Sequence, residues 1–188
     1  IPERLSALDR FFQRFPEYKE RVVFIQIGVP SRIQLTPYDR ISRKIATMEK
    51  EINAKYGTES WKPVVYLRKE LSNVAILALY RLADVCIVSS LHDGMNLVAK
   101  EYVAAKDYED GALILSSFTG AARELTDAIQ VNPYATEPFA ESIKLALEMP
   151  REERRRRMRA MRVVLRENNV YTWAVDMLSA AVALGSED

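Results

Sequence analysis

Short, continuously apolar segments alternate with helical segments along most of this sequence, and this alternation constrains the fold more than any other feature. The apolar segments have the length of strands and lie at residues 21–29, 62–68, 84–90, 111–117 and 128–133. Strands that are apolar on both faces and are separated by helices are typical of a parallel sheet covered on both sides. The sequence therefore predicts an α/β fold with a doubly wound parallel sheet.

Helical periodicity and helix-terminal residues mark the segments between the strands. Residues 2–14 carry apolar side chains at helical spacing. Residues 36–56 begin with Thr36 and Pro37, which suit the N-cap and the first helical position, and Gly57 follows as a stop. Further helices are expected from Ser72 to Leu82, up to about Lys106, just after Gly120, and from Glu137 to Met149.

The last part of the chain departs from the alternation. Residues 151–188 are typical of two consecutive helices with a break near Asn168, and they include the run Arg154–Arg157. Apolar residues between positions 158 and 165 share one helical face, and the arginines lie mostly opposite them. We interpret the arginines as a solvated helix face rather than a nucleic-acid site. We expect residues 1–150 to form the α/β domain, with the last helices packing on it.

Composition argues against several classes of function. Lys and Arg total 27 against 26 Asp and Glu, and the net charge of +1 favours neither nucleic acid nor an anionic membrane. No apolar run approaches the roughly 18 to 20 residues that span a bilayer, and no signal peptide is visible. The single cysteine, Cys86, lies in an apolar run, where we expect a buried structural residue in a reducing, cytoplasmic compartment.

The segment SSLHDGMNLVAKEY, residues 89–102, joins the end of a predicted strand to the start of a helix. Ligands of open parallel sheets bind at such junctions, outside the carboxyl ends of the strands. The amides around Leu97, Val98 and Ala99 are expected to form a donor cluster at the positive end of the helix, suited to a phosphate or diphosphate. Gly94 allows a ligand to lie against the backbone.

Two carboxylates in the same segment need another explanation, because an acid repels a phosphate. An ionised carboxylate accepts hydrogen bonds from two neighbouring hydroxyls, as a diol presents them. We therefore assign Asp93 to a sugar and Glu101 to a ribose, and these two groups with a diphosphate make up a nucleotide sugar. The alternative is that both acids are ordinary helix-terminal residues. A second junction around Gly120 is expected to line the same crevice, and Met95 is expected to pack inward.

Other ligand-binding and catalytic motifs are missing from the sequence. No G-x-G-x-x-G fingerprint follows the first strand, and there is no P-loop. His92 is the only histidine, which excludes His-rich metal sites and leaves one candidate base for a Ser-His-Asp arrangement. The acids of residues 107–110 are interpreted as a polar turn, so we expect no metal site.

The stretch DGMNLVAKEYVAAK strongly resembles the signature of the trehalose-6-phosphate synthase family, retaining glycosyltransferases with two Rossmann-like domains that face a cleft. Other stretches resemble the family in the same order, namely QIGVPSR (26–32), YGTESWKPVVYL (56–67), LYRLADVCIVSSLHDGMNLVAKEY (79–102) and GALILSSFTGAARELTDAIQVNP (111–133). The resemblance implies that residues 1–150 are the Rossmann-like, donor-binding half of a GT-B fold without its first strand. Residues 151–188 would pack on this half or return to the N-terminal domain of the same enzyme.

The resemblance also assigns roles to single residues. The donor site would comprise Asp93, Gly94, Met95, Asn96, Leu97, Val98, Ala99, Lys100 and Glu101. Glu101 would contact the ribose, Leu71 would hold the base through its main chain, and Arg32 would bind the phosphate of the acceptor. His92 stands where an arginine is common in the family. No residue of this chain is assigned a catalytic role.

The implied reaction transfers glucose from a nucleotide sugar (UDP-glucose or similar) to glucose 6-phosphate, giving trehalose 6-phosphate with no metal or cofactor. Family members carry an Arg and a Lys for the donor diphosphate just before the point where this chain begins. We therefore expect the chain alone to be inactive and to need the N-terminal domain as its partner. Two alternatives stay open: another phosphorylated acceptor, as in the similar glucosylglycerol-phosphate synthases, and a module that binds a nucleotide sugar without catalysis.

Overall fold

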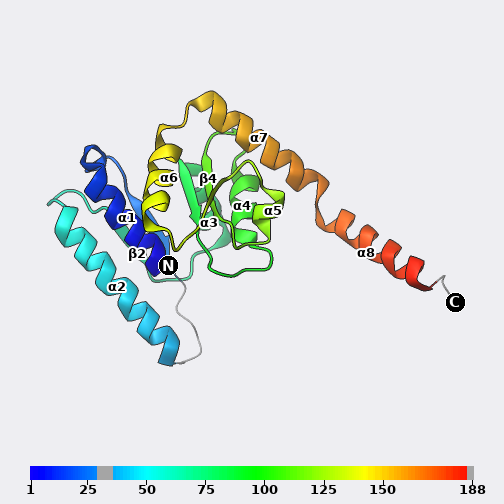
Figure 1. The fold of residues 1–188 in the computed structure, drawn as a ribbon, viewed down its shortest axis with the longest axis horizontal. Coiled ribbons are helices and arrows are strands. Elements are labelled where there is room, and N and C mark those ends of the chain that lie inside the picture. The colour runs from blue at the N-terminus through cyan, green and yellow to red at the C-terminus, as the bar shows by residue number, and fades with distance from the viewer. Residues whose placement is uncertain (29–35, 186–188) are drawn as a thin grey trace.

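The structure is a computed structural model that describes residues 1–28 and 36–185 (Figure 1). The helices are α1 (Pro2–Arg14), α2 (Thr36–Tyr56), α3 (Asn73–Leu82), α4 (Leu97–Ala105), α5 (Ala121–Glu124), α6 (Thr136–Glu148), α7 (Arg151–Glu167) and α8 (Val170–Gly185), with a short 3₁₀ turn, η1 (Pro16–Tyr18), after α1. The strands are β1 (Phe24–Ile27), β2 (Val64–Leu67), β3 (Val85–Val88), β4 (Ala112–Ser116) and β5 (Ile129–Val131). The predicted alternation of strands and helices is confirmed, although each strand is shorter than its apolar run.

The strands are all parallel, and they form two hydrogen-bonded groups. One group has the order β1-β2 and the other has the order β3-β4-β5. No pairing joins β1 to β3 in the part of the chain that the structure describes, so the parallel strands of the predicted α/β fold form two groups here. A side chain links the two groups instead. Arg4 on α1 donates to Ser89 Oγ (2.9 Å), just beyond β3, and to Gln26 Oε1 (3.1 Å) in β1.

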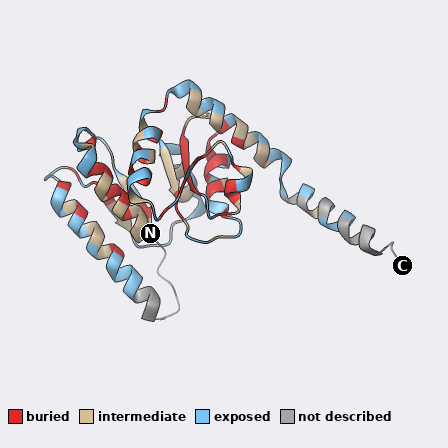
Figure 2. Ribbon diagram, in the orientation of Figure 1, coloured by how far each residue is buried: buried red, intermediate tan, exposed pale blue. Residues whose placement is uncertain are grey.

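Two hydrophobic cores lie on opposite faces of the second strand group. Side chains alternate along β4, because successive residues of a strand point to opposite faces. Ala112 and Ile114 belong to the core under α1, α2 and α6, whereas Leu113 and Leu115 belong to the core under α4, α5 and α7. All of these β4 residues are buried (Figure 2). Helices therefore cover both faces, as the sequence predicts for an α/β fold.

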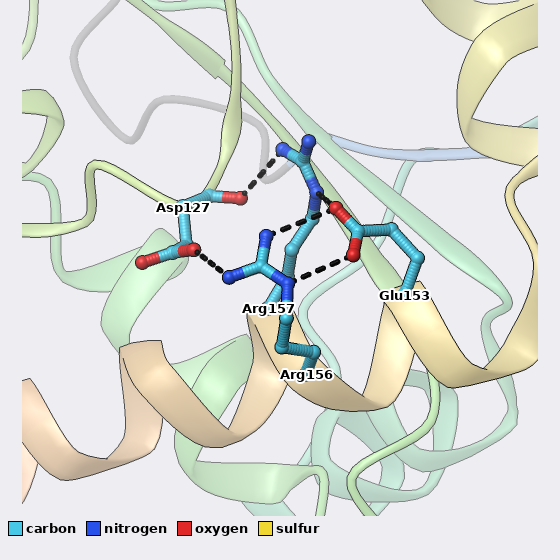
Figure 3. Close-up of polar contacts among 4 residues, drawn as sticks. All are labelled: Asp127, Glu153, Arg156 and Arg157. Carbon is cyan, nitrogen blue, oxygen red and sulfur yellow. Dashed lines mark hydrogen bonds and ion pairs between the residues drawn. The ribbon is translucent and has the colours of Figure 1, made fainter.

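Helix α7 is anchored on the second core. Met158 and Met161 are 0% and 2% exposed, which confirms the predicted apolar face. The arginines do more than cover a solvated face, because several of them form ion pairs. Glu153 accepts from Arg156 and Arg157, and both arginines also reach Asp127 in the loop before β5 (Figure 3). The hydrogen bonds from Arg156 and Arg157 lower the pKa of Glu153 to about 2.

Helix α8 extends away from the rest of the molecule (Figure 1). It carries a row of exposed apolar side chains at helical spacing, namely Tyr171, Val175, Leu178 and Val182. Within residues 1–28 and 36–185, none of the helices is both long enough and apolar enough to cross a membrane.

Candidate functional site

The junction between β3 and α4 is built around Asn96, the N-cap of α4. Its Oδ1 accepts from the Ala99 amide at 3.0 Å. Its backbone is left-handed, with φ of 69°, a conformation in which Asn is enriched because its short polar side chain bonds locally. The Nδ2 group donates to Ser90 Oγ (3.1 Å) and to Asp93 Oδ2 (2.8 Å). One buried side chain thus fixes the helix start and the loop before it.

Asp93 folds the same loop from its other side. Its Oδ1 accepts from the amides of Met95 (3.2 Å) and Asn96 (2.9 Å), while Oδ2 accepts from the Asn96 side chain. Both carboxylate oxygens therefore already hold the turn together. Since an ionised carboxylate has about four acceptor positions, these bonds leave room for a hydroxyl. The assignment of Asp93 to a sugar stays a prediction.

The second predicted junction, between β4 and α5, lies directly against the first. Asp93 and Thr119 form a parallel β-bridge, and the amides of Gly120 and Ala121 donate to the carbonyls of Asp93 (3.0 Å) and Met95 (2.9 Å). A Cβ added at Gly120 would overlap the carbonyl oxygen of Gly94. The expectation that the two junctions come together is confirmed, and the absence of a side chain at Gly120 makes the contact possible.

The helix start offers fewer free amides than the sequence predicts. The Ala99 amide is taken by the Asn96 side chain, so the predicted donor cluster is reduced to Leu97 and Val98. These two amides open the helix and have no acceptor within it. These two amides lie at the positive end of the α4 dipole, which favours a bound anion.

Apolar side chains surround this helix start on the outside. Met95 is 54% exposed, so the expectation that it packs inward is wrong. Leu97 and Val98 are exposed as well, although residues of this size are more often buried. The hydrogen bonds of Asp93 and Asn96 already hold the loop in place, so it does not depend on burying Met95.

The two charged residues of the first turns of α4 point to different neighbours. Lys100 Nζ donates to both carboxylate oxygens of Glu124 on α5, at 2.9 and 2.8 Å. Glu101 is exposed and accepts from the Tyr80 hydroxyl of α3 at 3.2 Å. Lys100 therefore ties α4 to α5, whereas Glu101 lies between α3 and α4.

Cys86 in β3 is not a reactive thiol. Burial raises its pKa to about 12, with the charge of Arg4 a smaller, opposing influence. The thiol stays protonated at neutral pH, which agrees with its prediction as a structural residue. Among the described residues, no three His, Cys, Asp or Glu side chains come close enough together to hold a metal ion.

A family model for glycosyltransferase family 20 matches residues 1–182 of this chain. The chain belongs to glycosyltransferase family 20. A trehalose-6-phosphate synthase from Enterobacter sp. (strain 638) is 41% identical over 92% of the chain. The match covers 37% of that relative.

Two solved structures agree with this membership of family 20. An α,α-trehalose-phosphate synthase (UDP-forming) from Burkholderia xenovorans, in complex with glucose-6-phosphate, matches 95% of this chain at 40% identity with a TM-score of 0.92. A structure from E. coli, described as trehalose-6-phosphate bound with UDP-2-fluoro glucose, matches 95% of the chain at 37% identity with a TM-score of 0.92. The family-20 chain studied here spans 40% of each of these structures.

Residues Asp93 to Glu101 of this family-20 chain lie in the loop after β3 and in the first turns of α4, and their assignment to a donor site stays a prediction. Leu71 is half-buried and directly precedes Ser72, the N-cap of α3. Arg32 falls outside the described residues. Tyr80 was not predicted, because its contact with Glu101 joins helices 21 residues apart in sequence and no local pattern marks it. The role of Asn96 as N-cap had a local signal, an Asn directly before the first helical residue.

Proposed function

We propose that this chain is the donor-binding part of a glucosyltransferase that moves glucose from UDP-glucose to glucose 6-phosphate, giving trehalose 6-phosphate and UDP. The observation that carries the proposal is the match, at 40% identity and a TM-score of 0.92, to a UDP-forming trehalose-phosphate synthase in complex with glucose-6-phosphate. The E. coli structure with UDP-2-fluoro glucose supports the choice of donor. The single unpaired cysteine supports a reducing, cytoplasmic location.

The junction at the start of α4 supplies the donor site in this proposal. The amides of Leu97 and Val98 face the diphosphate, where a helix N-terminus stabilises negative charge. Glu101 accepts from the ribose hydroxyls, and Asp93 accepts from the glucose. Leu71 holds the base through its main chain, and Arg32 binds the acceptor phosphate. Gly94, Met95, Asn96, Ala99 and Lys100 complete the loop and the helix start.

The arrangement of strands and helices supports the proposal that this chain packs against another part of the parent protein. Among the described residues β1 and β3 each have one edge without a strand partner, and we place a further parallel strand of the parent there. Residues 1–150 then form the Rossmann-like half, and α7 packs on it through its methionines. The exposed apolar row of α8 fits the N-terminal, acceptor-binding domain.

A turnover assay on the full-length parent tests the proposal. With UDP-glucose and glucose 6-phosphate we expect UDP release matched by trehalose 6-phosphate, with the α configuration retained in the product by NMR. Glycerol 3-phosphate serves as the competing acceptor. Faster transfer to it than to glucose 6-phosphate would contradict the proposed acceptor. Binding of UDP-glucose without transfer to either acceptor would indicate that the parent binds a nucleotide sugar without catalysing glucosyl transfer. The 188-residue chain alone is expected to give no product, because it spans 40% of the matched enzyme.

A further inference from the structure

Tyr80 joins the second core to the edge of the proposed donor site. Its ring lies edge-on to Tyr102, with centroids 6.1 Å apart, and Tyr102 is completely buried. Tyr80 itself is half-buried, and its hydroxyl donates to Glu101 Oε2 at 3.2 Å. The ring is therefore held by packing, and the hydroxyl is presented to an otherwise exposed carboxylate.

The protonation state of the Tyr80 hydroxyl makes it the hydrogen-bond donor to the Glu101 carboxylate. Burial raises the pKa of Tyr80, and the negative charge of Glu101 raises it further. The phenol therefore keeps its proton at physiological pH and stays a donor. A Glu side chain exposed on a helix has several rotamers, and ordering it in one of them costs side-chain entropy. A donor fixed by the core reduces that cost before a ligand arrives.

We propose that Tyr80 is a positioning residue that orients the Glu101 carboxylate toward a ribose diol, so that the site selects donors with an intact diol. This inference rests on the proposed function. The Tyr80 hydroxyl occupies one acceptor position of Oε2, which leaves the remaining positions of the carboxylate for the two ribose hydroxyls. A nucleotide without these hydroxyls gains nothing from the orientation of Glu101.

Calorimetry on the full-length parent tests the inference with UDP and 2′,3′-dideoxy-UDP as ligands. The variants are Tyr80→Phe, which keeps the ring and removes the donor, Glu101→Gln, and the two combined. Tyr108→Phe is the matched control, because Tyr108 is 74% exposed and lies outside the site. Tyr80→Phe should weaken UDP binding about three- to tenfold, the range for one neutral donor, and leave dideoxy-UDP binding unchanged.

The combined variant separates positioning from packing. In the Glu101→Gln background, Tyr80→Phe should cause no further loss of UDP affinity. Equal losses for UDP and dideoxy-UDP, or no loss for UDP, would overturn the role of Tyr80. Wild-type protein that binds no UDP would overturn the proposed function itself, which is a distinguishable result.

Discussion

At the scale of single residues, Asn96 holds the proposed site in shape. It combines a left-handed backbone, the N-cap of α4 and two side-chain hydrogen bonds to the loop before it. Few residues combine these properties, because most side chains are strained at positive φ and only a few types cap a helix. The loop therefore depends on this residue for its geometry, independently of any contact with a ligand.

Replacing Asn96 separates its backbone role from its cap role. Asn96→Ala should lower the free energy of unfolding by about 2–3 kcal/mol, from a lost cap of about 1 kcal/mol and a strained left-handed residue of about 1–2 kcal/mol. Asn96→Gly removes the strain and should cost clearly less. Urea denaturation of both variants measures the difference. Equal losses for Ala and Gly would show that the left-handed backbone is not a significant constraint.

Cys86 is half-buried in β3, and the reactivity of its thiol tests how far the strand is shielded from solvent. Its pKa of about 12 lies above the ordinary value of 9.0, because burial disfavours the thiolate. The native thiol should therefore react with a disulfide reagent at pH 8 far more slowly than the unfolded chain. The Cys86 thiol has a higher pKa in the folded protein than in the unfolded chain, so it favours the folded state as long as it is protonated. This contribution to the free energy of unfolding is complete at pH 8 and is lost as the pH rises from about 9 toward 12. Immediate reaction of the native protein would contradict this account.

At the scale of elements, the two strand–helix junctions meet through a pair of glycines. Gly120 has a helical backbone (φ of −59°, ψ of −37°) that alanine adopts freely, so the obstacle to a side chain there is steric: its Cβ would lie too close to the carbonyl group of Gly94. A Cβ at Gly94 meets nothing within 4 Å. The two positions therefore form a matched pair: packing excludes a side chain at Gly120, whereas a Cβ at Gly94 would point into open space.

Alanine at each glycine should give different results. Gly120→Ala forces the junctions apart and should lower the free energy of unfolding by about 1–3 kcal/mol, as overpacking does. Gly94→Ala should change it by less than about 0.5 kcal/mol but should weaken UDP-glucose binding, because the ligand is proposed to lie against that backbone. Denaturation and calorimetry on the full-length variants supply both values. A stable Gly120→Ala protein would mean that the junctions are not held in contact.

The sequence predicts elements better than it predicts the contacts between them. The cap of α3 by Ser72 and the apolar face of α7 follow local patterns, and both are present. The Lys100–Glu124 contact was not predicted, because it joins two helices that only the fold brings together. The exposure of Met95 was missed because hydrogen bonds, rather than apolar packing, hold its loop in place.

At the scale of the whole molecule, the strand groups and the last helix leave surfaces that the described residues do not cover. β1 and β3 are linked by Arg4 rather than by a ladder of backbone hydrogen bonds. Burial lowers the pKa of Arg4 to about 10, so the guanidinium still carries its charge at neutral pH. Both features agree with the proposal that these residues form the donor-binding part of a longer enzyme.

Hydrogen–deuterium exchange of the full-length parent, with and without saturating UDP-glucose, tests the proposed placement of the donor site most directly. The ligand should slow exchange in peptides that cover residues 89–102 and the start of α3, because those amides become bonded or shielded. Peptides from α7, with its run of arginines, should exchange at the same rate in both conditions. Unchanged exchange at residues 89–102, with protection on α7 instead, would contradict the proposed donor site.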